Sequence, residues 1–394
     1  MERFTYYMPT EVIFGKETEQ QVGTAVRKWG GSKVLLVYGE GSVVKSGLLD
    51  QVKESLESEG IYYEGIGGVV PNPRLGLVIE GAKQARAMEA DFILAIGGGS
   101  AIDTAKGIAL SNGNPDLDVW EDIWLEKVNV TQSTPLGVVL TLSAAGSETS
   151  ESSVLMHEET GRKKVLSIGL NRPKFAIMNP ELTYTIPRRQ LSCGIVDIMM
   201  HTMERYFSSV QGNELTDHIA EGLLRVTMKN GKVAMENQKS YQAMSELMWS
   251  GSISHNGLTG LGGVADFATH RIGHELSAKY DTYHGESLSV IWASWARFVC
   301  QTECTRHAQY AKAIFDMEGE NTKECALQGI VATEAYFASV DMPICFGDLE
   351  EGVRPDNELR EMAQRATLNN TITLGSIMKL DEEAVYEILK MANH

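Results

Sequence analysis

Short apolar runs alternate with helical patterns over roughly the first 180 residues. Continuous apolar runs predict buried strands at residues 33–38, 61–66, 91–96, 136–140 and 175–178. Apolar side chains recur every three or four residues, as on one face of a helix, at 48–56, 75–88 and 101–110. Apolar strands separated by helices are typical of a parallel sheet covered on both faces. We therefore expect an α/β domain with right-handed crossovers.

Two segments depart from this alternation. Residues 153–156 and 164–168 flank Glu159-Thr160-Gly161-Arg162, which predicts a β-hairpin with a glycine-containing turn. The first segment, residues 4–14, carries Tyr6, Tyr7, Val12 and Ile13 around Pro9, and we expect it to be extended edge structure.

After Pro187 the pattern is almost entirely helical. Loop signals lie near residues 212–213, 257–263, 281–284, 319–321 and 343–355. The chain is therefore expected to form two domains, an α/β dinucleotide-binding domain over 1–186 and an all-helical domain over 187–394. A cleft between the domains is the expected place for a ligand.

Charge and cysteine content exclude several classes of protein. The 35 Lys and Arg residues and 52 Asp and Glu residues give a net charge of −17, which disfavours binding to nucleic acid or to an anionic membrane. No apolar run approaches the ~20 residues that span a bilayer, and no signal peptide is recognised at Met1–Tyr7. Five cysteines without a CxxC pair indicate free thiols and a cytoplasmic location.

A glycine-rich turn follows the predicted strand at 91–96. Gly97-Gly98-Gly99-Ser100 lets the backbone approach a ligand closely, and the free N–H groups at the helix start favour a phosphate. The spacing is not GxGxxG. The alternative is a tight turn in which Ser100 caps the helix and Asp103 completes a capping box.

A second turn, Gly39-Glu40-Gly41-Ser42, follows the first predicted strand. Ligands of doubly wound sheets lie beyond the carboxyl ends of the strands, so one dinucleotide could touch both turns. Thr141 and Ser143 follow the strand at 136–140 and would face the same edge, although loop polarity alone also explains them.

Acid and imidazole side chains cluster in the second half. Asp197 and His201 are four residues apart and share one helix face, as do His270 and His274, and His284 follows a break. One Asp and three His form an N₃O donor set that suits Fe²⁺ or Zn²⁺ in a catalytic site. Coincidental surface polarity is the alternative, and spacing alone leaves open which of the three later histidines bind.

Several motifs then occur together in a fixed order: Gly97–Ser100 with Asp103 and Lys106, Thr141–Glu148, Gly194–Asp197 with His201-Thr202, His270–Glu275 and His284-Gly285. This combination resembles the iron-containing (group III) alcohol dehydrogenases over nearly the whole chain. Tyr38-Gly39, Gly41-Ser42, Lys45 and Pro71-Asn72-Pro73 are most similar to the branch of butanol dehydrogenases and NADPH-dependent aldehyde reductases.

The resemblance implies a Rossmann-like nucleotide-binding domain followed by an all-α metal-binding domain, the fold shared with dehydroquinate synthase. It assigns Fe²⁺ or Zn²⁺ to Asp197, His201, His270 and His284, and it places His274 in the reaction cleft outside the metal shell. It implies NADP or NAD contacts at Gly39, Gly41, Ser42, Asn72, Gly98, Gly99, Ser100, Asp103, Thr141, Leu142, Lys163 and Leu182. Lys163 could equally be a solvated hairpin lysine.

Two residues depart from the family pattern. Glu40 stands where the NADPH-dependent branch usually has glycine. A carboxylate there would repel a 2′-phosphate and could accept a hydrogen bond from a 2′-hydroxyl. His255 is also unexpected, and a structural role or a place in the cleft would explain it.

The implied activity is hydride transfer between NAD(P)H and a short-chain aldehyde or primary alcohol, with His274 or the nicotinamide ribose hydroxyl as a proton relay, in a cytoplasmic homodimer. Two alternatives belong to other classes. One is a metal- and NAD-dependent lyase or cyclase of the dehydroquinate-synthase type, which would need a basic pocket that the ligand motifs lack. The other is a non-catalytic nucleotide-binding protein.

Overall fold

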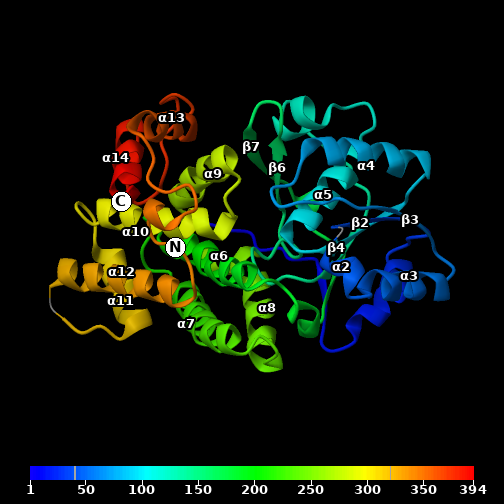
Figure 1. Cartoon of the computed structure of the whole chain (residues 1–394), viewed down its shortest axis with the longest axis horizontal. Coiled ribbons are helices and arrows are strands. Elements are labelled where there is room, and N and C mark those ends of the chain that lie inside the picture. Colours follow the sequence, from blue (N-terminus) through cyan, green and yellow to red (C-terminus); the bar gives the residue numbers. More distant parts are fainter. Residues whose placement is uncertain (40, 320) are drawn as a thin grey trace. The chain divides into compact units, whose positions relative to one another are not determined.

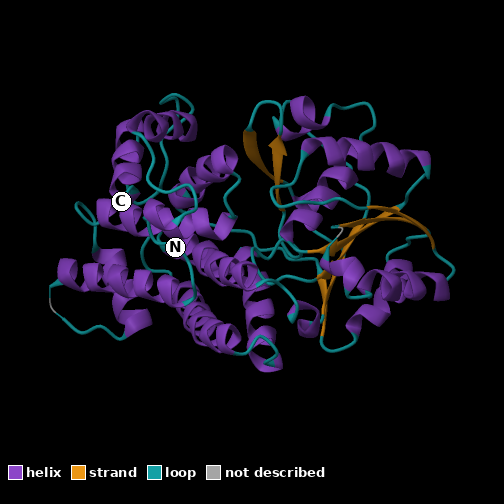
Figure 2. Ribbon diagram, viewed as in Figure 1, coloured by secondary structure: helices purple, strands orange, loops and turns teal. Residues whose placement is uncertain are grey.

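The computed structural model describes residues 1–39, 41–319 and 321–394, which form two compact units (Figure 1). The sheet unit comprises Tyr7–Ile186 and Lys239–Asn256, and the helical unit comprises Met1–Tyr6, Pro187–Gln238 and Gly257–His394. Figure 2 shows the strands, in orange, within the sheet unit.

The sheet unit is built on a six-stranded, all-parallel sheet. The strands in spatial order are β1 (Glu11–Phe14), β8 (Phe175–Met178), β5 (Leu136–Leu140), β4 (Phe92–Gly97), β2 (Lys33–Tyr38) and β3 (Tyr62–Ile66). The five strands predicted from apolar runs are all present. The first segment supplies the expected edge strand, although only its last four residues pair.

Alternate side chains of each strand enter two separate cores. Leu35 and Val37 pack with α4 (Leu75–Ala87) and α5 (Gly99–Gly113). Leu36 packs on the other face with α1 (Val22–Lys28) and α3 (Leu48–Ser58). Helices thus cover both faces, which is why the strands are apolar throughout.

Smaller elements complete the sheet unit. The predicted hairpin is formed by β6 (Ser152–His157) and β7 (Arg162–Ser167). Short helical turns include α2 (Ser42–Lys45) and the segments Thr18–Gln21, Val119–Trp124, Gly169–Asn171 and Pro180–Thr183. Helix α8 (Tyr241–His255), from the second half of the sequence, also belongs to this unit and buries Met248 in the sheet core.

The helical unit contains the remaining long helices: α6 (Arg188–Tyr206), α7 (Glu214–Glu236), α9 (Ala268–Tyr280), α10 (His284–Val299), α11 (Thr305–Phe315), α12 (Thr322–Ser339), α13 (Asp356–Ala366) and α14 (Glu382–Ala392). Single turns occur at Leu258–Gly260 and Phe346–Asp348. An aromatic cluster that includes Phe207, Trp295 and Tyr310 fills part of its core. Within the described ranges, no helix combines the length and apolarity needed to cross a bilayer.

Candidate metal centre and nucleotide-binding edge

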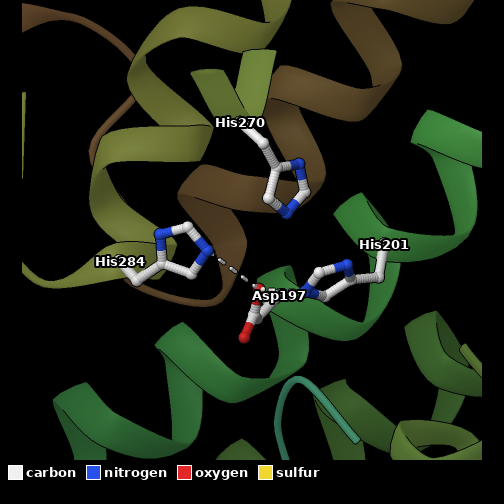
Figure 3. A group of neighbouring side chains, drawn as sticks. All are labelled: Asp197, His201, His270 and His284. Atoms are coloured by element: carbon white, nitrogen blue, oxygen red, sulfur yellow. Dashed lines mark ion pairs between the residues drawn. The ribbon is translucent and has the colours of Figure 1, made fainter. Parts of the chain in front are cut away.

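Four predicted metal ligands come together inside the helical unit. One donor atom from each of Asp197, His201, His270 and His284 lies within 4.8 Å of the other three (Figure 3). The Nε2 atoms of His201 and His284 lie 3.5 and 3.7 Å from Asp197 Oδ1. Residues separated by up to 87 positions in the sequence therefore converge on one point.

Local sequence explains how three helices deliver these side chains. Asp197 and His201 are one turn apart on α6, so their side chains project from the same face. Helix α9 carries His270 and ends before Asp281, whose positive φ of 55° turns the chain. Helix α10 then begins at His284, and its ring centroid lies 5.3 Å from that of His270.

The burial and chemistry of the group fit a divalent transition metal. Asp197, His201 and His270 are each 5% exposed. The Nε2 atom of His270 is buried and has no hydrogen-bond partner among the residues that the structure describes. A buried nitrogen without a partner is costly unless a ligand satisfies it. An N₃O donor set suits Fe²⁺ or Zn²⁺.

His274 lies beside this group rather than within it. Its ring centroid is 6.4 Å from that of His270 and 5.4 Å from that of His284. The histidine is buried and is one helical turn after His270 on α9. The geometry therefore separates His274 from the four converging residues, a distinction that the spacing of the histidines left open.

One acidic residue next to the group, Glu204, was not among the predicted site residues. Glu204 lies near the end of α6 and is 3% exposed. Its Oε1 atom lies 3.0 Å from Nδ1 of His270 and accepts a 3.0 Å hydrogen bond from the backbone N–H of the same residue. In the sequence, its position three residues after His201 and seven after Asp197 would have placed it on the same helix face as these two residues.

In the sheet unit, the predicted cofactor residues follow the carboxyl ends of several strands. After β2 the chain adds β3 at one edge of the sheet, whereas after β4 it adds β5 on the opposite side of β4. The switch point of the topology therefore lies between β2 and β4, where ligands of open α/β sheets bind. Gly39, Gly41 and Ser42 follow β2, whereas Gly98, Gly99 and Ser100 follow β4. Glu40 lies outside the described residues.

The turn after β4 packs tightly on one side and is open on the other. An added Cβ at Gly98 would lie 2.9 Å from Leu142 Cβ, and the backbone N–H of Thr141 donates to Gly97 O at 3.1 Å. An added Cβ at Gly99 or Gly41 meets no atom within 4 Å among the described residues beyond its chain neighbours. Helix α5 begins at Gly99 without a side-chain cap, so the alternative capping box of Ser100 and Asp103 does not form.

Asp103 belongs to a buried polar network. Its carboxylate accepts hydrogen bonds from Ser147 Oγ at 2.7 Å and from the backbone N–H of Val154 at 2.9 Å. Burial raises the pKa of Asp103, and the Lys106 charge opposes this shift. Burial also lowers the pKa of Lys106 to about 8, against the attraction of Asp103. The Asp103 carboxylate is therefore hydrogen-bonded to Ser147 and Val154 of its own chain.

The other predicted residues lie in four places. Lys163 on β7 donates to Asn72 Oδ1 at 2.9 Å, which joins two predicted cofactor contacts and ties the hairpin lysine to Asn72. Leu182 packs against the core beneath β5 and β8. The Oγ atom of Ser143 is buried without a hydrogen-bond partner in the described ranges. His255 ends α8, where its Cβ lies 3.0 Å from a Cβ added at Gly146.

Comparison with known proteins covers both units. Residues 9–180 match the family model for iron-containing alcohol dehydrogenase, and residues 192–393 match the model for the C-terminal region of the same family. NADH-dependent butanol dehydrogenase A of Clostridium acetobutylicum is 37% identical over 389 residues, 98% of each chain. NADPH-dependent aldehyde reductase YqhD of Escherichia coli is 32% identical over 88% of this chain and 89% of its own.

Solved structures agree in fold. The crystal structure of NADH-dependent butanol dehydrogenase A from Thermotoga maritima superposes with a TM-score of 0.95 at 34% identity, and it covers 100% of this chain and 99% of its own. Both the sheet unit and the helical unit therefore have counterparts in one known protein. The chain belongs to the family of iron-containing alcohol dehydrogenases.

Proposed function

We propose that this oxidoreductase transfers a hydride between NAD(P)H and a short-chain aldehyde or primary alcohol. The observation that carries the proposal is the convergence of Asp197, His201, His270 and His284 within 4.8 Å, inside a chain of this family. Relatives with 35–37% identity are named NADH-dependent butanol dehydrogenases. Their substrate class is the one we propose for this chain.

The four converging residues would hold the metal, for which we propose Fe²⁺ or Zn²⁺. A bound divalent metal supplies Lewis-acid polarisation of a carbonyl oxygen. Asp197 provides the anionic donor, and the three histidines provide neutral donors. The ring of His274, 5.4 Å from that of His284, would hold or pass a proton near the reacting oxygen, since imidazole titrates near neutral pH.

The switch point between β2 and β4 would bind the dinucleotide. Gly39, Gly41 and Ser42 after β2 and Gly98, Gly99 and Ser100 after β4 would offer backbone N–H groups to phosphate. Asn72, Thr141, Leu142, Lys163 and Leu182 would line the cofactor, and Asp103 would act by holding Ser147 and Val154 in place. We propose NADH as the preferred donor, because Glu40 would repel a 2′-phosphate.

Three further proposals concern the domains of the chain, its location in the cell and its assembly. We propose that the chain forms two domains whose main boundary lies between residues 186 and 187, with Met1–Tyr6 grouped with the helical unit and Lys239–Asn256 with the sheet unit. We also propose that the protein is cytoplasmic and that it assembles as a homodimer. The relatives give no support to a dehydroquinate-synthase-like lyase or to a non-catalytic nucleotide-binding protein.

An anaerobic assay tests the function. Butanal reduction is followed by the loss of reduced-nicotinamide absorbance with NADH and NADPH in parallel, after chelation and after Fe²⁺ or Zn²⁺ is added back. We expect turnover that requires the metal and is faster with NADH. A protein that holds the metal but reduces no aldehyde with either cofactor would contradict the proposed substrate class.

A further inference from the structure

Glu204 shares a helix face with two of the proposed ligands. Asp197, His201 and Glu204 are related as i, i+4 and i+7 along α6, so their side chains lie along one stripe. One helix therefore presents two donors to the metal position and, one turn further on, a carboxylate that contacts a third donor, His270 of α9.

The contact distinguishes the two nitrogens of the His270 ring. An ionised carboxylate offers only acceptor oxygens, so the nitrogen 3.0 Å from Glu204 Oε1, Nδ1, must carry the hydrogen. Nε2 then keeps its lone pair, and this is the buried nitrogen that lacks a hydrogen-bond partner within the described ranges. Figure 3 shows a ring nitrogen of His270 directed toward the other three side chains.

We propose that Glu204 is a positioning residue that fixes the tautomer and ring orientation of His270 and thereby strengthens metal binding. The inference rests on the proposed metal centre. A carboxylate behind a histidine ligand orients the ring and makes the imidazole a better donor, and its loss typically lowers metal affinity ~10–100-fold.

Other contacts join the end of α6 to the segment that leads into α9. The backbone N–H of Asp266 donates to the backbone oxygen of Glu204 at 2.8 Å. Asp266 Oδ1 accepts from the N–H of Ala268, the first residue of α9, at 3.2 Å. The guanidinium of Arg205 lies 5.0 Å from the ring centroid of Phe267. Removal of the Glu204 side chain leaves all three contacts in place.

Metal affinity measured on the full-length, metal-free protein tests this inference. Co²⁺ is titrated against a chromophoric chelator, and the visible spectrum of the bound ion is recorded. We expect Glu204→Ala to bind Co²⁺ ~10–100-fold more weakly than the wild type. Glu204→Gln should restore most of the affinity, because the amide oxygen can accept both hydrogen bonds that Oε1 accepts. The melting temperature of each metal-free variant reports folding separately.

Glu221→Gln is the matched control. Glu221 on α7 is 4% exposed, accepts from Tyr206 Oη at 2.9 Å through Oε1, and has Oε2 2.9 Å from His218 Nδ1. Its substitution should leave Co²⁺ affinity unchanged. Wild-type affinity in Glu204→Ala, or equal losses in Glu204→Ala and Glu204→Gln, would overturn positioning through the hydrogen bond. A wild-type protein that binds no Co²⁺ would instead refute the proposed metal centre.

Discussion

In the sheet unit, Lys106 is surrounded by oxygen atoms of its own chain, whereas in the helical unit one carboxylate and three imidazoles converge on one point. Lys106 Nζ donates to the carbonyl oxygens of Ser147, Ser150 and Ser152 at 2.7–3.1 Å. The carboxylate of Asp197 approaches the His201 and His284 nitrogens only to 3.5 and 3.7 Å, beyond ordinary hydrogen-bond distance.

The difference shows how a structural polar cluster can be distinguished from a binding site. A cluster that closes on itself stabilises the fold, because each charge is compensated inside the protein. A carboxylate and three imidazoles whose donor atoms converge on one point form a donor set that suits a divalent metal ion. The two regions should therefore respond in opposite ways to substitution.

Removal of a converging donor should have the largest effect. Asp197→Ala is expected to lose the metal and to lower turnover by at least ~1000-fold, since the anionic ligand and the Lewis acid disappear together. Metal content and anaerobic aldehyde reduction measure the two losses. Asp217→Asn, which alters a buried carboxylate paired with Arg306, should keep the metal. An active, metal-free Asp197→Ala protein would refute the centre.

Removal of the buried lysine should affect stability instead. Lys106→Met leaves Asp103 and several carbonyl groups without their charged partner, and we expect a loss of about 3 kcal/mol in the free energy of unfolding. Co²⁺ affinity should stay unchanged. Urea titration followed by circular dichroism measures the loss, and Lys83→Met on an exposed position of α4 is the control. If Lys106→Met kept its stability but bound Co²⁺ more weakly, the Lys106 cluster would serve the metal centre and not the stability of the sheet unit.

Substitution of His274 tests whether this histidine is one of the metal ligands. Because its ring lies outside the four donors, His274→Ala should keep the metal but reduce turnover by ~100-fold, the lower end of the range for a lost general acid or base. The pH dependence of the rate should lose one titration step as well. Full activity of the variant at every pH would remove His274 from the mechanism, whereas loss of the metal would place it among the ligands.

Another buried histidine, His307, lies among apolar side chains rather than beside the proposed metal ligands. His307 is 1% exposed, stacks on Phe207, and has no hydrogen-bond partner at either ring nitrogen in the described part of the chain. Burial, aided by the Arg306 charge, lowers its pKa from 6.5 to about 3. The unfolded chain therefore binds a proton that the folded chain refuses, and stability falls as the pH drops below 6.5.

His307→Phe should abolish this part of the acid sensitivity. Between pH 7 and pH 5 the wild type should lose about 2 kcal/mol more than the variant. Urea unfolding at both pH values measures the difference. His218 is exposed and its pKa is raised by Glu221, so His218→Gln should shift the pH dependence in the opposite direction. Identical pH dependence in the wild type and His307→Phe would contradict the assignment.

Regular elements could be predicted because their causes are local. The strands 33–38, 136–140 and 175–178 were predicted with their observed bounds, since continuous apolar runs mark strands covered on both faces. The convergence of Asp197 and His201 also followed from helix geometry. Helical spacing, however, could not show that α8 joins the sheet core, because periodicity indicates a buried face but not its partner.

Long-range polar contacts were beyond local reasoning. Asp103 bonds to Ser147 and Val154, which lie 44 and 51 positions later in the chain. Glu204 meets His270 only because α9 packs beside α6. In both cases the residue type was visible in the sequence, but its role depended on which segment the fold placed opposite it.

Cofactor choice is the smallest effect that we predict, and it concerns the open edge of the sheet unit. Glu40→Gly removes the carboxylate that would repel a 2′-phosphate, so the ratio of kcat/KM for NADPH over NADH should rise by about 10-fold, the equivalent of ~1.4 kcal/mol. Metal content should stay at the wild-type value, because position 40 follows β2 in the sheet unit and the proposed metal ligands belong to the helical unit. An unchanged ratio would mean that Glu40 does not face the adenosine ribose, and cofactor preference would then have to be sought at other residues of the same edge.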